Sequence, residues 1–333
     1  MGNPTRLETY LYLLLSLTFP ILALSTPTTV FTLPGPVAPA SWFENLAVRP
    51  NGLILATRGD APEIWQINPA TGQGALLVSV SGAFNLTGIA EVTPRRRPRR
   101  AVTDCPETYI FGSSHIPAPL QVEPGSAKVW KLQFGATNPS AAPTVSLLTA
   151  MPNAGFINGI AAWDKGRVLL GDTEAESVYL MDVDTGAYTT PFTDMTGING
   201  IKTRPGYLYW ASHAAQTLSR IPISSAAVAT GPAEVLAANQ SIDDFAIAVG
   251  HSGKGKAYIG SMYENSVVEV KVGAAPSSGP GVKRVVASNL SGTGTGLCTV
   301  VASGRRPQDS HLLYATVGQG GGSASIVVLD PTQ

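Results

Sequence analysis

Six similar segments follow one another along this chain, and this repetition constrains the fold more than any local pattern does. Each segment starts with a polar residue and continues through a small-apolar stretch, a turn with Gly or Pro, an apolar strand, a polar loop and another apolar strand. They begin at Asn45, Thr87, Asn158, Asn199, Asp244 and Thr295, in steps of 42, 71, 41, 45 and 51 residues. A four-stranded propeller blade takes about 40 to 50 residues. The sequence therefore predicts an all-β, six-bladed β-propeller of four-stranded antiparallel blades.

The third segment predicts its four strands most clearly, at 157–163, 167–171, 177–183 and 188–192. The long second step carries its surplus in 95–107 and 116–124, which are rich in Pro or charge and belong on surface loops. The sixth segment ends one strand short, and the apolar residues 29–33 can supply that strand. We therefore expect an N-terminal strand to close the ring and to leave no open sheet edge.

Charge excludes one large class of partner. Among 333 residues, 22 Lys and Arg balance 22 Asp and Glu, and only 13% of residues are charged. A nucleic-acid-binding protein would show a basic surface, so nucleic acid is not expected as a partner. The basic run from Arg95 to Arg100 is typical of a solvated loop, here in the turn between the first two strands of its blade.

The first residues form a secretory signal-peptide pattern. Arg6 precedes an apolar run from Tyr10 to Leu24, which ends near Ala23-Leu24-Ser25. A membrane anchor is the alternative, but the run is shorter than the roughly 20 residues of a spanning helix, and Pro20 interrupts it. We predict a signal peptide at 1–25, a single propeller domain at 26–333, a secreted protein and no membrane association after cleavage.

Secretion gives meaning to two further features. Asn85, Asn239 and Asn289 begin triplets of the N-glycosylation type, whereas Asn138 is excluded by Pro139. Cys105 and Cys298 could pair in an oxidising compartment, or they could remain unpaired because one lies in an insertion and the other in an inner strand.

Blade topology predicts which residues meet at one face. The start of each inner strand and the loop after each second strand lie at the same end of the disc, so the six residues that open the segments should surround the axis. Around them we expect rim residues, of which Arg58, His115, Asp172, Ser212, His213 and Tyr263 are the most informative, together with Phe156. Convergent polar groups in a concave centre are typical of a ligand site, although they can also serve only to satisfy backbone groups and water.

The Asn-Gly-Ile openings at Asn158 and Asn199, the Pro50-Asn51-Gly52 turn and strands such as 63–67 resemble the senescence-marker/gluconolactonase-like group of six-bladed propellers. In lactonases of that group a divalent cation, usually calcium, lies in the central ring. The resemblance implies Glu44 (or Asn45), Asn158, Asn199 and Asp244 (or Asp243) as its ligands. The blade-one match is shifted by one residue, because Glu44 is followed by Asn45 and Leu46 instead of Gly and Pro.

A narrower resemblance involves the segment from Trp42 to Gly52, which is similar to secreted fungal hetero-Diels–Alderases of tropolone sesquiterpenoid biosynthesis. It implies an intermolecular cyclisation between a tropolone o-quinone methide and a humulene-type alkene, with small apolar substrates and no required cofactor. Catalytic groups would be Asn158, Asn199, Asp244, His115 and His213. Substrate-binding groups would be Asn45, Thr87, Thr295, Arg58, Asp172, Ser212, Tyr263 and Phe156.

Two alternatives remain at this point. One is a calcium-dependent lactonase or esterase of the gluconolactonase type, and the other is a propeller that binds a ligand without catalysis. The weakened ligand pattern counts more against the hydrolase than against a catalyst that works by holding its substrates in a reactive pose. A Ser-His hydrolytic triad is not favoured, because no Gly-x-Ser-x-Gly motif is present.

Overall fold

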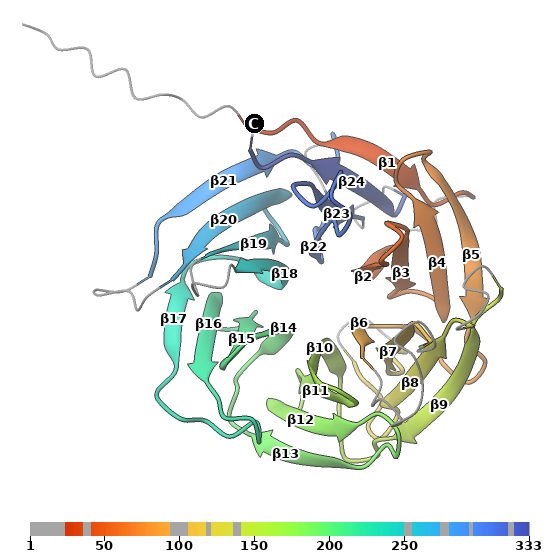
Figure 1. The fold of residues 1–333 in the computed structure, drawn as a ribbon, viewed down its shortest axis with the longest axis vertical. Coiled ribbons are helices and arrows are strands. Elements are labelled where there is room, and N and C mark those ends of the chain that lie inside the picture. The colour runs from red at the N-terminus through yellow and green to blue at the C-terminus, as the bar shows by residue number, and fades with distance from the viewer. Residues whose placement is uncertain are drawn as a thin grey trace, which may run out of the picture.

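In the part of the chain that the structure describes, the repeated segments form 24 strands in six antiparallel sheets arranged around a central axis (Figure 1). The computed structural model describes residues 24–35, 41–93, 106–117, 121–135, 141–249, 255–273, 280–292, 296–318 and 323–332. Those residues contain strands, turns and bridges, and no helix. The predicted fold class, an all-β propeller with six four-stranded blades, is confirmed.

In each of the first five blades the strands run outward from the axis in chain order. Blade one holds β2 (Phe43–Val48), β3 (Ile54–Arg58), β4 (Glu63–Asn68) and β5 (Gln73–Ser79). Blade two holds β6 (Ile89–Val92), β7 (Thr108–Ser113), β8 (Lys128–Gln133) and β9 (Thr144–Ala150). Blade three holds β10 (Ile157–Asp164), β11 (Arg167–Asp172), β12 (Ser177–Asp182) and β13 (Tyr188–Phe192), within two residues of the predicted bounds.

Blade four holds β14 (Ile198–Arg204), β15 (Tyr207–Ser212), β16 (Thr217–Pro222) and β17 (Glu234–Ala237). Blade five holds β18 (Ile242–Val249), β19 (Gly255–Ser261), β20 (Ser266–Val272) and β21 (Lys283–Ser288). Blade six holds β22 (Val301–Ser303), β23 (Leu313–Val317) and β24 (Ser325–Leu329).

Blade six is completed from the other end of the chain. Its outer strand is β1 (Thr28–Thr32), which pairs antiparallel with β24, as the sequence predicts. Ser25 extends this closure, because its N–H donates to Val286 O over 2.8 Å and its hydroxyl accepts the N–H of Asp330 over 3.0 Å. The mature chain keeps these bonds only if a signal peptide ends before Ser25. Residues 1–23 and the basic run at 95–100 lie outside the described residues.

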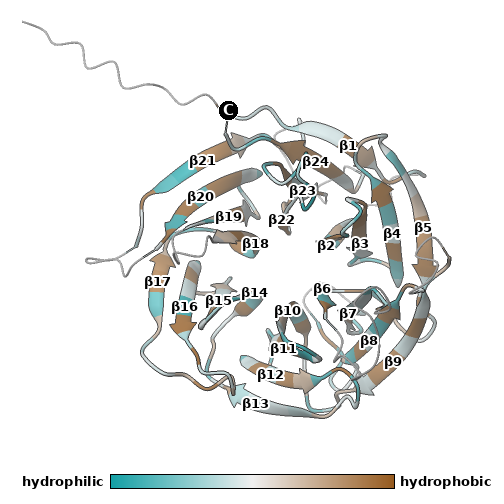
Figure 2. Cartoon of the chain, viewed as in Figure 1, coloured by the Kyte–Doolittle hydropathy of each residue, from teal (hydrophilic) through white to brown (hydrophobic). Residues whose placement is uncertain are grey.

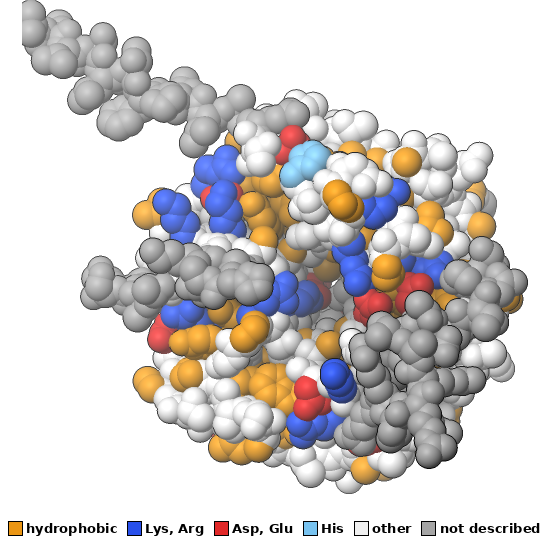
Figure 3. Space-filling model, viewed as in Figure 1, with side chains coloured by type: hydrophobic (Ala, Val, Ile, Leu, Met, Phe, Trp, Pro, Cys, Tyr) orange, Lys and Arg blue, Asp and Glu red, His pale blue; other side chains and the backbone are white. Residues whose placement is uncertain are grey.

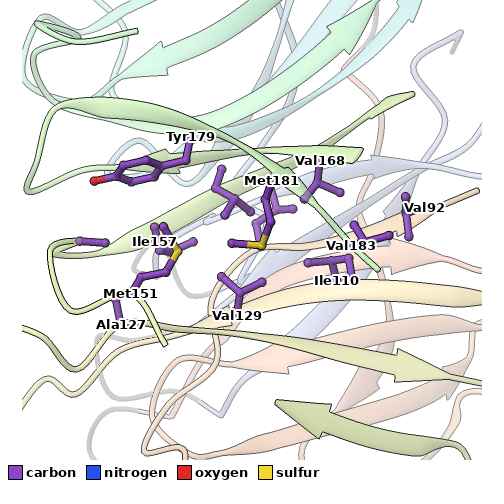
Figure 4. Close-up of a cluster of buried hydrophobic side chains, with 13 residues drawn as sticks. Val92, Ile110, Ala127, Val129, Met151, Ile157, Val168, Tyr179, Met181 and Val183 are labelled. Carbon is purple, nitrogen blue, oxygen red and sulfur yellow. The ribbon is translucent and has the colours of Figure 1, made fainter. Parts of the chain in front are cut away.

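The hydrophobic core lies between neighbouring sheets. Val129 and Ile110 of blade two pack with Ile157, Val168 and Met181 of blade three in one buried cluster (Figure 4). Each sheet therefore buries both faces against its neighbours, and hydrophobic residues alternate with polar ones along the outer strands (Figure 2). This packing holds the inner strands, and hence their polar ends, at fixed positions around the axis.

The surface agrees with the balanced composition. On the face shown in Figure 3, basic and acidic side chains are interspersed with hydrophobic and neutral ones. Within the described part of the chain, no helix has the length and apolar character needed to cross a membrane.

Candidate functional site

The inner strands of four blades share a β-bulge at the end where they begin. Ile157 pairs with Asp172 and Ile160 with Leu170, so Asn158 and Gly159 stand opposite the single residue Gly171. The ladders of blades one, four and five shift in the same way, between Phe43 and Asn45, Ile198 and Ile201, and Ile242 and Phe245. Bulges of this kind re-aim side chains and are frequent beside active sites.

The two remaining blades follow the same geometry through individual hydrogen bonds. In blade two, Thr87 N donates to Gly112 O over 3.0 Å and Gly112 N to Gly88 O over 3.1 Å. In blade six, Leu297 pairs with Gly318, and Thr316 N donates to Val300 O over 3.1 Å. Thr87-Gly88 and Cys298-Thr299 are therefore the pairs that correspond to Asn158-Gly159.

Two rings result from this register. The first ring contains the first bulge position of every blade, namely Glu44, Thr87, Asn158, Asn199, Asp243 and Cys298. The second ring contains the next position, namely Asn45, Gly88, Gly159, Gly200, Asp244 and Thr299.

This register corrects the alignment of repeats made from the sequence. Asn45 and Asp244 belong to the second ring, and Glu44 and Asp243 are the true equivalents of Asn158 and Asn199. In blade six the equivalent is Cys298, whereas Thr295 lies outside the described residues. In blades one and five a bulge breaks the two-residue alternation of a strand, so matching residues by type slips by one position. In blade six the match to Thr295-Gly296 followed residue type and lies three positions before Cys298.

Two carboxylates of the first ring are buried, and among the described residues neither forms an ion pair with a basic side chain. Glu44 and Asp243 are 8% and 4% exposed. Burial raises the pKa of Glu44 to about 7, with the Trp42 indole opposing and Asp244 adding to the rise. Burial and the charges of Glu44 and Asp244 raise the pKa of Asp243 well above its ordinary value, against the opposing effects of Asn199 and Lys202. Carboxyl groups are thus crowded where blades one and five meet the axis, and burial and this crowding favour their protonated forms.

Side chains of three blades join directly in the second ring. Asp244 accepts a hydrogen bond from Asn45 Nδ2 over 2.9 Å. It also forms an ion pair with Lys202, whose Nζ lies 2.5 and 2.7 Å from the two carboxylate oxygens. Lys202 also lies 5.5 Å from the centre of the Phe245 ring. We call Asn45, Lys202 and Asp244 the axial brace.

Lys202 was not predicted as a site residue, although the repeats contain a signal for it. The same position in the other blades is Ala47, Ala90, Ala161, Ala246 or Val301. A single lysine among small apolar residues in aligned repeats indicates a specific partner, which the structure identifies as Asp244.

We call the end of the disc where the inner strands begin the mouth. Three buried side-chain atoms in the described part of the chain have no hydrogen-bond partner, and all three lie at the mouth, in blades three and four. They are Thr173 Oγ1, Asn199 Oδ1 and His213 Nδ1. The backbone fixes their location, because Thr173 N donates to Phe156 O over 2.9 Å and His213 N to Gly197 O over 2.8 Å. An unpaired buried polar atom costs about 1 to 3 kcal/mol. A ligand, water or ion would therefore be bound most favourably on this side.

The first ring fits a hard cation chemically. Glu44, Asn158, Asn199 and Asp243 bring two carboxylates and two amides to equivalent bulge positions, and oxygen donors of these types are the ones that calcium prefers. Asn199 Oδ1 has no hydrogen-bond partner within the described residues. For the three acids Glu44, Asp243 and Asp244, the axial brace supplies a single basic group, Lys202. Among the described residues no group of three or more His, Cys, Asp or Glu could hold a metal, so a cation here would depend on the amide oxygens.

Several predicted rim and ring residues have their polar atoms engaged within the protein. Arg58 binds Asp60 and Glu63. The carboxylate of Asp172 accepts bonds from the N–H groups of Gly155, Phe156 and Ala175 and from Tyr179. Ser212 donates to Thr196 O over 2.7 Å, and Thr87 donates to Ile157 O over 2.6 Å. Their part in building the mouth is evident, while a part in substrate binding stays a prediction.

Aromatic and imidazole rings surround the mouth. His115 stacks on Phe84 and pairs with Glu123, and His213 meets Tyr263 edge to face with ring centres 5.9 Å apart. Trp42 Nε1 donates to Glu44 over 2.6 Å, and Phe156 is half-buried. Two other aromatics near the ring in sequence, Phe43 and Phe245, belong to the core instead.

The residues predicted for modification lie in different surroundings. Asn85 is 5% exposed and its Oδ1 accepts Ser114 N over 3.0 Å, so a glycan would disrupt this packing and we do not retain Asn85 as an acceptor. Asn239 and Asn289 are exposed, and their glycosylation stays a prediction. Cys298 is a buried free cysteine, and burial raises the pKa of its thiol. Cys105 lies outside the described residues.

Comparison with known sequences gives two distant relatives, and no family model matches the chain. A protein of Phoma sp., provisionally named hetero-Diels–Alderase, is 24% identical over 62% of this chain and 66% of its own length, just under two thirds. A second protein with the same provisional name, asR5 of Sarocladium schorii, is 23% identical over 83% of this chain and 75% of its own length. The chain thus resembles proteins named as hetero-Diels–Alderases.

Solved structures confirm the architecture. Regucalcin of Agrobacterium tumefaciens, described as a calcium-binding protein, has a TM-score of 0.59 at 14% identity, over 92% of this chain and 95% of that one. A luciferin-regenerating enzyme has a TM-score of 0.63 at 10% identity over the same shares. At these identities the likeness shows the fold alone, and chemistry has to be argued from the site.

Proposed function

We propose that the mouth catalyses an intermolecular hetero-Diels–Alder cyclisation, in which a conjugated o-quinone methide of tropolone type adds to a humulene-type alkene in tropolonic sesquiterpene biosynthesis. The proposal rests on the composition of the mouth, where aromatic and imidazole side chains surround the first-ring asparagines and three buried polar atoms have no hydrogen-bond partner. The provisional names of the two relatives point the same way.

The chemistry needs no proton or electron from the protein. The C=C–C=O unit of the quinone methide and the C=C bond of the alkene combine, one C–C and one C–O bond form, and every atom is retained in the dihydropyran. The barrier falls when both partners are held in a reactive orientation. The aromatic rings at the mouth would hold the faces of the two apolar substrates.

Polar groups would act on the quinone-methide oxygen, where negative charge develops as the bonds form. Asn158, Asn199 and His213 stand on the side of the mouth with the unpaired atoms. The unpaired atom of Asn199 is the acceptor Oδ1 and its side chain bonds to Asp243, so its donor to the substrate would be the remaining N–H of Nδ2. Donors fixed in advance around such an oxygen typically contribute about 10²-fold or more to the rate. Asp244, by contrast, is occupied by Lys202 and Asn45, so its role would be to hold the ring in shape.

The test is a rate and stereochemistry measurement with a generated o-quinone methide and humulenol. We expect faster formation of one stereoisomer, and a loss of about tenfold to a hundredfold in rate for Asn199→Ala. Asn51→Ala is the matched control, because Asn51 caps the turn at the opposite end of β2 through Leu53 N. Product ratios equal to the uncatalysed background for the native protein would exclude the proposal. Binding of both substrates without acceleration would point to the non-catalytic propeller.

The register of the first ring favours one second candidate, a cation-dependent lactonase or esterase. Glu44, Asn158, Asn199 and Asp243 would hold the cation, which when bound would polarise a carbonyl and activate water. The aromatic residues at the mouth would bind the acyl compound. His213, whose backbone N–H donates to Gly197 O two residues before Asn199, would exchange a proton with the leaving oxygen.

Thermal unfolding distinguishes the two candidates. If the ring binds calcium, added Ca²⁺ should raise the Tm and EDTA should lower it. Glu44→Gln should abolish that shift, whereas Asp164→Asn, which changes an exposed acid paired with Arg167, should keep it. No shift in the native protein, together with no metal by elemental analysis, would remove the lactonase and leave the cyclase unaffected.

Secretion is proposed on the signal-peptide pattern alone. N-terminal sequencing of protein recovered from the medium of an expressing fungus should show a mature chain that begins near Thr26, after the predicted signal peptide at 1–25. Retention of the full chain inside the cell would contradict it. Removing exposed acceptors with Asn239→Gln and Asn289→Gln should reduce the mass of the secreted protein by two glycans.

A further inference from the structure

An exposed aromatic side chain stands at the mouth with its ring stacked on an imidazole. The centres of the Phe84 and His115 rings are 3.8 Å apart and their planes differ by 25°. Phe84 is nevertheless 59% exposed, so the surface not covered by His115 is open to solvent. Single exposed apolar side chains are common on protein surfaces, so what distinguishes Phe84 is the ordered stack beside the mouth and not its exposure alone.

The imidazole that supports Phe84 is held from several sides. Glu123 binds His115 Nδ1, Glu123 N donates to His115 O over 2.8 Å, and Ser126 Oγ accepts His115 N over 2.9 Å. The loop that carries Phe84 is fixed to this segment, because Ser114 N donates to Asn85 Oδ1 over 3.0 Å. The stacked pair is therefore an ordered surface built from two joined loops, and binding against it would require little reorganisation.

The place of Phe84 in the fold is specific. It lies three residues before Thr87 of the first ring, which limits its Cα to about 10 Å from that residue. The corresponding residues of other blades are small or polar, namely Ser41, Gly155, Thr196 and Gln240. Exposed apolar residues on the outer strands, such as Leu76 and Leu147, are aliphatic and lie away from the axis. An aromatic ring beside the polar ring thus occurs where a ligand would enter.

We propose that Phe84, supported by His115 and Glu123, is a stacking subsite for the planar conjugated ring of the substrate. This inference rests on the proposed function, in which one partner is planar and oxygen-bearing and the other is a flexible alkene. A planar ring gains from stacking on a flat aromatic surface, and a puckered ring of the same size does not. The subsite would select the diene partner and present its oxygen to the donors of the first ring.

Binding of tropolone, a planar seven-membered ring, tests the subsite directly, with the puckered cycloheptanone as comparison. Calorimetric titration of the full chain should show tropolone bound about tenfold more weakly by Phe84→Leu, with cycloheptanone unchanged. Phe84→Tyr should restore the native affinity, because it restores the ring. Leu147→Ala, which changes a residue of comparable exposure (50%) on the outer strand of the same blade, should bind tropolone like the native protein.

Equal tropolone affinity in the native protein and Phe84→Leu would overturn the subsite, as would equal losses for both ligands. Phe84→Leu should keep the native Tm, because the side chain it shortens is exposed, so a change in affinity can be assigned to the ring. The two proposals fail differently: tropolone binding that depends on Phe84 without any catalysed cyclisation would refute only the reaction, and catalysis that is insensitive to Phe84→Leu would refute only the subsite.

Discussion

The two halves of the central ring hold their inner strands together in different ways. In blades two, three and four the second-ring residue is Gly88, Gly159 or Gly200, whereas blades one, five and six carry Asn45, Asp244 and Thr299. A Cβ added to Gly159 would lie 2.4 Å from Asn199 O, and one added to Gly200 would lie 2.2 Å from Asp244 Oδ1. We call blades two to four the glycine half and blades five, six and one the polar half. In the glycine half the inner strands pack closely because the second-ring residues lack side chains, and in the polar half second-ring side chains connect the strands.

This difference separates two tasks. In the glycine half the second-ring residues have no side chains that could bond to Asn158 and Asn199 of the first ring. The unpaired atoms of the mouth occur in this half. In the polar half the second-ring side chains bond within the protein: Asn45 donates to Asp244, which also pairs with Lys202 of blade four, and Thr299 Oγ1 donates to Phe43 O over 2.8 Å. We infer that the polar half stabilises the ring and the glycine half is left to bind ligands.

The largest effect is expected from breaking the axial brace with Lys202→Met. Asp244 is only 2% exposed and would lose the only basic partner among the described residues, and removing one member of a buried ion pair costs about 3 kcal/mol or more. Urea unfolding should show this loss. Adding Asp244→Asn should recover about half of it, because the uncompensated charge is then gone. A Lys202→Met protein as stable as the native one would mean that the polar half does not depend on the brace.

A smaller effect is expected when the glycine half is overfilled by Gly159→Ala. The new methyl group would collide with backbone atoms of blade four at 2.4 and 2.6 Å, and overpacking of this kind costs about 2 kcal/mol. The control is Gly281→Ala, where the nearest atom to an added Cβ is Leu236 O at 3.4 Å. Equal Tm values for the two variants would show that the inner strands can separate freely.

The smallest losses of stability are expected when one threonine hydroxyl that bonds to a main-chain oxygen is removed in each half of the ring. Thr87→Val removes one hydroxyl bond, to Ile157 O, and should cost about 1 kcal/mol. Thr299→Val removes the bond to Phe43 O and also the contact with Thr316 Oγ1 at 2.7 Å, so it should cost about 1.5 kcal/mol. The difference in denaturant midpoint at constant m-value measures this comparison. A larger loss for Thr87→Val would reverse the assignment of the stabilising half.

Repetition in the sequence was sufficient for the architecture, because period and strand pattern are local properties that every blade repeats. Even closure by residues near 29–33 followed from counting strands. The site was predicted only in outline. Asn158 and Asn199 were found because Gly follows each of them, but Glu44, Asp243 and Cys298 were displaced in the alignment because a bulge inserts a residue without changing local composition.

Other parts of the site depend on contacts between distant residues. Nothing near Asp244 in sequence indicates that Lys202 and Asn45 will reach it from other blades. The stack of Phe84 on His115 likewise joins two loops separated by an insertion whose path sequence does not define. Such pairings arise from radial closure of the sheets, and the sequence alone gives only candidates for them.

The seam between β1 and β24 has a consequence for how the protein is made. Strands almost 300 residues apart must pair before the circle exists, as Thr28 does with Val328. Until then blades one and six each present an uncovered flank, and bringing such remote segments together is slow because of the chain entropy it costs. Newly synthesised molecules would pass through an open, C-shaped intermediate, in which the exposed β24 edge could recruit β1 of a second molecule and produce chains of linked subunits.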